Sequence, residues 1–142
     1  MKKSYVLFAS VLFALLMVFT GCDNKKNEAV ENLKERMEAD NDLKEMVKEF
    51  RRNLPIRYTN DITCTDVRLT SKAMEYVYTV SSGTAVPSKA TVENIVEQQI
   101  DANEDFADMV ENLVATNRDL VYRYEGYQKI VLKSKNLKKL IE

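Results

Sequence analysis

The chain of 142 residues contains no histidine. Histidine is the commonest general base in enzymes and a frequent zinc ligand, because its side chain titrates close to neutral pH. Its absence excludes Ser-His-Asp and Cys-His catalysis as well as histidine-ligated zinc. We therefore predict no catalytic residues, no metal site and no cofactor, and we expect that the protein is not an enzyme.

Glycine is scarce, and the chain has no excess of basic charge. Three glycines in the whole chain cannot form the glycine-rich loop that cradles phosphate groups. Of the 21 basic residues, Lys2 and Lys3 precede the apolar run described below, and all 22 acidic residues follow it, which leaves 19 basic against 22 acidic. The resulting net charge near −3 argues against nucleic acid as a partner.

The N-terminal segment has the three parts of an export signal. Lys2 and Lys3 supply positive charge, residues 5–19 are uncharged and almost wholly apolar, and small residues then precede a cysteine. The apolar run is shorter than the about 20 residues that a membrane-spanning helix needs. The sequence Phe19-Thr20-Gly21-Cys22 resembles the lipobox of bacterial lipoproteins. This resemblance implies removal of residues 1–21 and attachment of a diacylglyceryl group to the sulfur of Cys22.

The resemblance also implies where the protein is located. Each buried CH₂ of an acyl chain contributes about 0.8 kcal/mol, so two or three chains form a firm membrane anchor at Cys22. We expect a signal peptide (1–21), a polar tether (22–27) and a single domain (28–142) held at the cell envelope, outside the cytoplasm. Asp23 would specify the inner membrane in enterobacteria-like sorting, but other bacteria read other signals, so both inner and outer membranes stay open.

Lipidation of Cys22 leaves Cys64 as the single remaining thiol. Free cysteine is among the residue types most often buried, and Cys64 lies in an alternating, β-branched segment. We interpret it as a small buried strand residue. The alternative is a reactive thiol or an intermolecular disulfide.

Two segments have the apolar periodicity of amphipathic helices. Residues 28–53 form the first, with a break or restart expected at residues 39–42 (Ala-Asp-Asn-Asp), whose types favour helix starts. Residues 91–116 form the second, which we predict to be uninterrupted, with Phe106, Val110 and Leu113 buried. Residues 38–43 resemble residues 101–106; we interpret this as coincidence, with an internal repeat as the alternative.

The remaining segments predict two β-hairpins. Strands are expected at 56–69 and 73–81, joined by residues 70–72, and at 119–125 and 128–133, joined around Gly126. Residues 134–142 read as a lysine-rich tail. The order helix, hairpin, helix, hairpin predicts an α+β domain in which a four-stranded antiparallel sheet carries both helices on one face.

Acidic residues form the most distinctive chemical pattern. No basic residue lies between Thr91 and Thr116, and carboxylates recur there at three- and four-residue spacing. Such like-charge pairs each cost a few tenths of a kcal/mol. A basic protein partner would offset this cost, so we select four candidate binding residues: Glu97, Asp101, Glu104 and Asp108. The alternative is a solvated helix face; calcium is a third reading, but a straight helix cannot alone supply six to eight ligand oxygens.

Strand tyrosines form the second pattern, and they alternate with Arg57, Arg68, Glu75 and Arg123. Tyr and Arg together are enriched at binding surfaces, although Tyr is also a good strand former. The candidate binding residues here are Tyr76, Tyr78, Tyr122 and Tyr124.

These features predict a membrane-tethered, non-catalytic protein that binds another protein of the envelope, as an inhibitor, an immunity-type protector or an assembly accessory. The alternative is a lipoprotein that binds a small ligand in a tyrosine-rimmed pocket between sheet and helix. A pocket above roughly 300 Å³ with converging polar groups would favour the small ligand, and a well-covered sheet would favour the protein partner.

Overall fold

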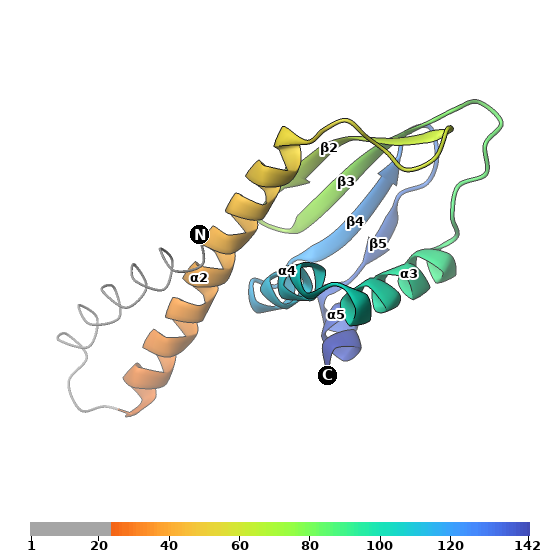
Figure 1. Ribbon diagram of the computed structural model, residues 1–142. Helices are drawn as coiled ribbons and strands as arrows, with labels where there is room; N and C mark the ends of the chain where they lie inside the picture. The colour runs from red at the N-terminus through yellow and green to blue at the C-terminus, as the bar shows by residue number, and fades with distance from the viewer. Residues whose placement is uncertain (1–23) are drawn as a thin grey trace.

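The computed structural model of the protein describes residues 24–142, and the side chains from Val30 onward. The predicted signal peptide and Cys22 lie outside the described residues. The chain is α+β, as predicted, and Figure 1 shows the sheet as one layer with α3, α4 and α5 below it and α2 along one side. The helices are α2 (Asn24–Arg52), α3 (Lys89–Ala102), α4 (Glu104–Ala115) and α5 (Ser134–Ile141).

The sheet has five strands and is mixed, so the predicted four-stranded antiparallel sheet is wrong. The strands β1 (Ile56–Arg57), β2 (Ile62–Leu69), β3 (Ala73–Val80), β4 (Asp119–Tyr124) and β5 (Ile130–Leu132) lie in chain order across the sheet. β3 and β4 are parallel, and the other neighbours are antiparallel. The reason is the connection: a loop and two helices carry the chain back to the end where β3 began, and such a crossover permits parallel pairing.

The predicted strand 56–69 is divided because the chain reverses within it. The backbone amides of Tyr58 and Thr59 both donate to the carbonyl oxygen of Ile62, at 3.0 and 3.2 Å. β1 therefore folds back on β2, with Ile56 opposite Cys64. The predicted hairpin through residues 70–72 is present between β2 and β3.

Helix α2 runs without the expected break at residues 39–42. It begins at Asn24, so helical backbone extends into the segment expected to be a tether. Asp40 is held in the helix interior by two ion pairs, at 2.8 Å to Lys44 Nζ and at 2.8 Å to Arg118 Nη2. Because the Asp40 carboxylate binds these two partners, it does not cap a new helix start at this position, and α2 continues.

The predicted uninterrupted helix 91–116 is instead two helices, because Asn103 caps both. Its backbone is extended (φ −134°, ψ 109°), and its N–H donates to Gln99 O at 2.9 Å to close α3. Its side-chain Oδ1 accepts from Phe106 N at 3.2 Å to open α4. Asparagine is a preferred N-cap residue, and Glu104 and Asp105 in the first turn favour the positive helix start.

The expected C-terminal tail contains helix α5. Its Leu137 side chain is completely buried in the core. Apolar residues at three- and four-residue steps, Leu137, Leu140 and Ile141, give this segment one packed face, with the lysines on the other.

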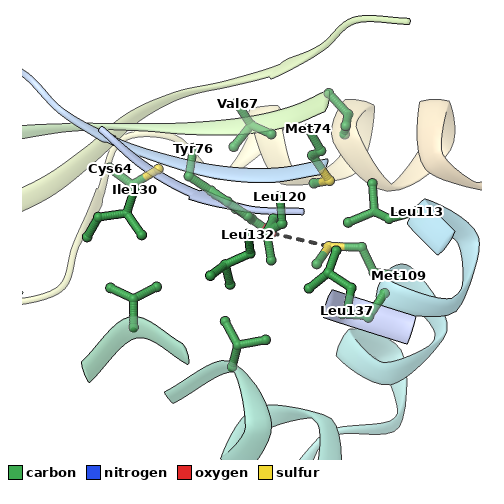
Figure 2. Close-up of a cluster of buried hydrophobic side chains, with 14 of the residues drawn as sticks. Cys64, Val67, Met74, Tyr76, Met109, Leu113, Leu120, Ile130, Leu132 and Leu137 are labelled. Atoms are coloured by element: carbon green, nitrogen blue, oxygen red, sulfur yellow. Dashed lines mark hydrogen bonds between the residues drawn. The ribbon is translucent and has the colours of Figure 1, made fainter. Parts of the chain in front are cut away.

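One core lies between the sheet and the helices. Alternate residues of β3 (Met74, Tyr76 and Tyr78) point into it together with Leu120 of β4. Figure 2 shows Leu113, Met109 and Leu137 reaching this layer from α4 and α5. Val110 and Leu113 are completely buried, as predicted.

Candidate functional site: a groove between α2 and α4

The predicted acidic stripe does not form one surface. The break at Asn103 places Glu97 and Asp101 on α3, and Glu104 and Asp108 on α4. Glu97, Asp101 and Glu104 are exposed. Asp108 alone of these four residues lies in the groove between α2 and α4 that is described below.

The tyrosines lie on the sheet face that the helices cover, and they therefore form no exposed binding surface. Tyr76 stacks on Tyr122 with ring centroids 5.5 Å apart, and Tyr78 stacks on Tyr124 at 4.9 Å. The Tyr76 hydroxyl donates to Met109 Sδ at 3.3 Å, which joins β3 to α4 (Figure 2). Burial raises the pKa of Tyr76, Tyr78 and Tyr122, so these phenols remain neutral and serve as core residues.

The other sheet face carries the charged residues that alternate with the tyrosines, and three of them, Arg68, Glu75 and Arg123, are paired there. Arg123 Nε lies 2.8 Å from Glu75 Oε1, and Arg68 lies 3.7 Å from the same oxygen. Arg68 also contacts Asp66 at 3.1 Å, and Asp66 contacts Arg51 of α2 at 3.6 Å. This ladder pairs three arginines with two carboxylates, so most of its charge is compensated within the domain.

A groove of about 670 Å³ runs between α2 and α4 and reaches down to β3. Its floor is apolar and rich in methionine and aromatic side chains, from α2 (Met46, Phe50), β3 (Met74, Tyr76) and α4 (Phe106, Met109). Phe106, predicted to be buried, is only partly buried because it lies in this floor instead of beneath the helix. Phe50 packs edge-on against Tyr76 at a centroid distance of 5.4 Å, which joins the α2 wall to the β3 floor.

Both rims of the groove are acidic. The α2 rim carries Asp42, Glu45 and Glu49, and the α4 rim carries Asp105, Asp108 and Glu111. None of the described residues that line the groove is Lys or Arg. Two facing rows of like charge repel each other, and the residues within each row also repel at three- and four-residue spacing. A cation placed between the rims would relieve both repulsions.

Of the six rim carboxylates, only Asp108 on the α4 rim was predicted from the sequence, and none on the α2 rim was. The spacing of Asp42, Glu45 and Glu49 is the same signal as in the second helix, and it was available in the sequence. Lysines interleaved along α2, such as Lys44 and Lys48, obscure it, because they lie on a different side of the helix. Which carboxylates face each other depends on how α2 packs against α4.

Cys64 is completely buried, which confirms its interpretation as a buried strand residue. Its thiol donates to Asp66 O at 3.5 Å. Burial raises the pKa of the thiol, and so it disfavours the thiolate that a reactive cysteine needs.

Among the side chains that the structure describes, from Val30 onward, no three acidic or cysteine groups converge as metal ligands. In the same part of the chain, no helix has the length and apolar composition needed to cross a bilayer. No protein-family model, curated protein or solved structure matches this chain.

Proposed function

We propose that this protein is a lipid-anchored, non-catalytic binding protein of the bacterial cell envelope, and that its α2/α4 groove binds a basic, amphipathic segment of another protein. The observation that carries this proposal is the apolar floor between two acidic rims. Cys22 provides the anchor in this proposal. The partner acts in the envelope, so inhibition, immunity-type protection and assistance in assembly are all compatible roles.

The floor and the rims would recognise different parts of such a segment. Apolar side chains of the partner would be buried on Phe50 and Phe106, and the flexible Met46 and Met109 could adapt to their shape. Lysines or arginines at the edges of the segment would reach the carboxylates of the rims. Grooves between helices commonly accept an amphipathic helix in this manner. The rim charges would chiefly raise the association rate and exclude acidic competitors.

A small cationic amphiphile is the second candidate occupant. The groove volume of about 670 Å³ falls within the usual range of small-molecule sites, roughly 300–1,000 Å³. Carboxylates extend over about two turns of each helix, however, and this favours an elongated partner with several positive charges. The tyrosines of the small-ligand alternative also lie mostly in the core beneath the helices, and of the four candidates only Tyr76 lines the groove.

The groove proposal can be tested with two variants that each remove four carboxylates from the full-length protein. The groove variant carries Glu45→Gln, Glu49→Gln, Asp105→Asn and Glu111→Gln. The matched control variant carries Glu93→Gln, Glu97→Gln, Asp101→Asn and Glu104→Gln, which are exposed residues outside the groove. The probes are a synthetic helical peptide of leucine and lysine, and spermidine as a small cation.

We expect the groove variant to bind the peptide at least about tenfold more weakly, which corresponds to 1.4 kcal/mol, and the control variant to bind it nearly as the wild type does. Equal weakening in both variants would mean that only net charge matters, and it would refute the groove. Phe106→Ala should also weaken peptide binding, because it shortens the floor without altering charge. Spermidine binding that matches or exceeds peptide binding would instead favour the small-ligand function.

The anchor requires a separate test. Cys22→Ser should release the protein from membranes or leave an uncleaved precursor, since the acceptor sulfur is gone. A Cys22→Ser protein that stays membrane-bound at mature size would contradict the anchor while leaving the groove proposal intact. Capture experiments with the lipidated protein from its own envelope then identify the partner.

A further inference from the structure

Helix α2 carries opposite charge on its two flanks. Asp42, Glu45 and Glu49 face the groove, whereas Lys44, Lys48 and Arg51 lie on the other side of the line that packs against the core. At 100° per residue these three basic residues fall within an arc of about 60°. Core residues Leu43 and Val47 separate the two flanks.

The basic flank continues onto neighbouring elements. Two adjoining depressions along this side of α2 are lined by Arg36, Lys44, Lys48, Arg51, Lys72 and Arg118. Only two carboxylates, Asp40 and Asp119, lie among their lining residues. We call this surface the basic flank.

Internal ion pairs neutralise only part of the basic flank. Asp40 pairs with Lys44 and Arg118, and Arg51 pairs with Asp66. The exposed side chains of Arg36, Lys48 and Lys72 make no ion pair within residues 30–142. The flank therefore has uncompensated positive charge, and it lies on the flank of α2 that faces away from the acidic groove.

We propose that the basic flank binds the anionic phospholipid headgroups of the membrane to which Cys22 tethers the protein, and that this contact turns the acidic groove away from the bilayer. The inference rests on the proposed anchor. Helix α2 begins at Asn24, two residues after Cys22, and its N-terminal part extends beyond the sheet (Figure 1). A helix of 29 residues is about 43 Å long, so it can lie along the headgroup layer from its point of attachment.

The same membrane field would act on both sides of the domain. Headgroups attract Lys and Arg that lie within about one Debye length, near 8 Å at physiological salt. In an orientation that brought the groove to the bilayer, the same headgroups would repel the carboxylates of its rims. Both forces favour one orientation, in which the groove is open to partners in the surrounding compartment.

The experiment compares the mature protein, lipidated on Cys22, in phosphatidylcholine vesicles and in phosphatidylglycerol vesicles. The readout is the rate at which a water-soluble amine reagent labels Lys44 and Lys48, with Lys89 as the internal reference. Lys89 is exposed and is the first residue of α3, a helix that begins on the side of the domain away from α2 (Figure 1). We expect labelling of Lys44 and Lys48 to slow at least about threefold in phosphatidylglycerol alone, and to recover in high salt because screening shortens the attraction.

Two variants complete the test. Arg36→Gln, Lys48→Gln and Lys72→Gln together should abolish the protection of Lys44, whereas Lys129→Gln, Lys135→Gln and Lys138→Gln together should leave it unchanged. A mass spectrum of the protein in each vesicle separates the two proposals. Protein without lipid on Cys22 would overturn the anchor, whereas lipidated protein with equal labelling in both vesicles would overturn the orientation alone. Protection in both vesicles that grows with protein density would show contact between copies and would also overturn the orientation.

Discussion

The ion pair between Arg118 and Asp40 offers the most informative perturbation of the fold. Arg118 is 9% exposed and lies where the chain enters β4. Its Nη2 donates to Asp40 Oδ1 of α2 at 2.8 Å, and its Nε donates to the carbonyl oxygen of Thr70 at 2.8 Å. One side chain thus joins α2, the turn between β2 and β3, and the start of β4. Because α2 forms a wall of the groove, this pair also fixes the position of that wall.

The magnitude follows from what each partner retains after Arg118→Met, which preserves most of the side-chain volume. Asp40 keeps its ion pair with Lys44, and its side chain is 30% exposed, so no fully buried unpaired charge results. The carbonyl of Thr70 belongs to an exposed residue and can accept from water. We therefore expect a loss of about 1.5–2.5 kcal/mol in the free energy of unfolding, typical of charged hydrogen bonds, and less than the 3–5 kcal/mol for a broken buried pair.

The pH dependence has a definite sign. The hydrogen bond from Lys44 is the largest cause that lowers the pKa of Asp40; desolvation opposes it, and Arg118 lowers it further. A folded-state pKa below the unfolded value of about 3.9 means that the stabilisation is present above that value. It is lost as the pH falls through the lower, folded-state pKa.

The assay is a double-mutant cycle with Arg118→Met and Asp40→Asn, measured by urea unfolding. We expect a coupling energy of about 1–2 kcal/mol at neutral pH that shrinks toward zero at acidic pH, once Asp40 is protonated in the wild type. Equal denaturant slopes in all four proteins would confirm that the unfolding transition is unchanged. A coupling energy of zero at neutral pH would refute the assignment of this pair as the link between α2 and the sheet.

Three further predictions concern the core, the helix break and the thiol. Leu113→Ala should destabilise the domain by about 2–5 kcal/mol, because Leu113 is completely buried, and Phe106→Ala should destabilise it clearly less, because Phe106 is only partly buried. Equal losses of stability in thermal unfolding would contradict the placement of Phe106 in the groove floor. Asn103→Ala should cost about 1 kcal/mol through loss of the α4 cap, with Asn103→Asp close to wild type; an unchanged melting temperature for the alanine variant would show that the cap is dispensable. Cys64 should react with a thiol reagent only on unfolding, because it is buried and its pKa is raised, and rapid labelling of the native protein would contradict this.

The two segments with helix-capping residues show how far local sequence determines a helix break. Residues 38–43 and 101–106 carry similar acidic and amide residues, and both have cap-forming potential. We expected a break in the first segment and none in the second, and the structure has the opposite. The Asp40 carboxylate accepts a hydrogen bond from Arg118, a residue 78 positions away in the sequence. Asn103, by contrast, has its capping partners within four residues. A local cap signal is decisive only where no distant partner competes for the same side chain.

The groove, too, depends partly on local sequence and partly on tertiary packing. The spacing of carboxylates on each helix is a property of the sequence, and it identified Asp108 as a candidate binding residue. That Asp42, Glu45 and Glu49 form the facing rim follows only from the packing of α2 against α4. The tyrosine face was recognised by alternation along the strands, but alternation cannot tell which face the helices cover.

The sequence by itself determined the α+β class, the hairpin between β2 and β3, and the burial of Val110, Leu113 and Cys64. These properties follow from apolar periodicity and turn residues, which act over a few positions along the chain. The tertiary structure decided the parallel pairing of β3 with β4, the partner of Asp40 and the groove between two acidic helices. Each of these depends on contacts between residues distant in sequence, whose geometry is fixed only when the whole core packs.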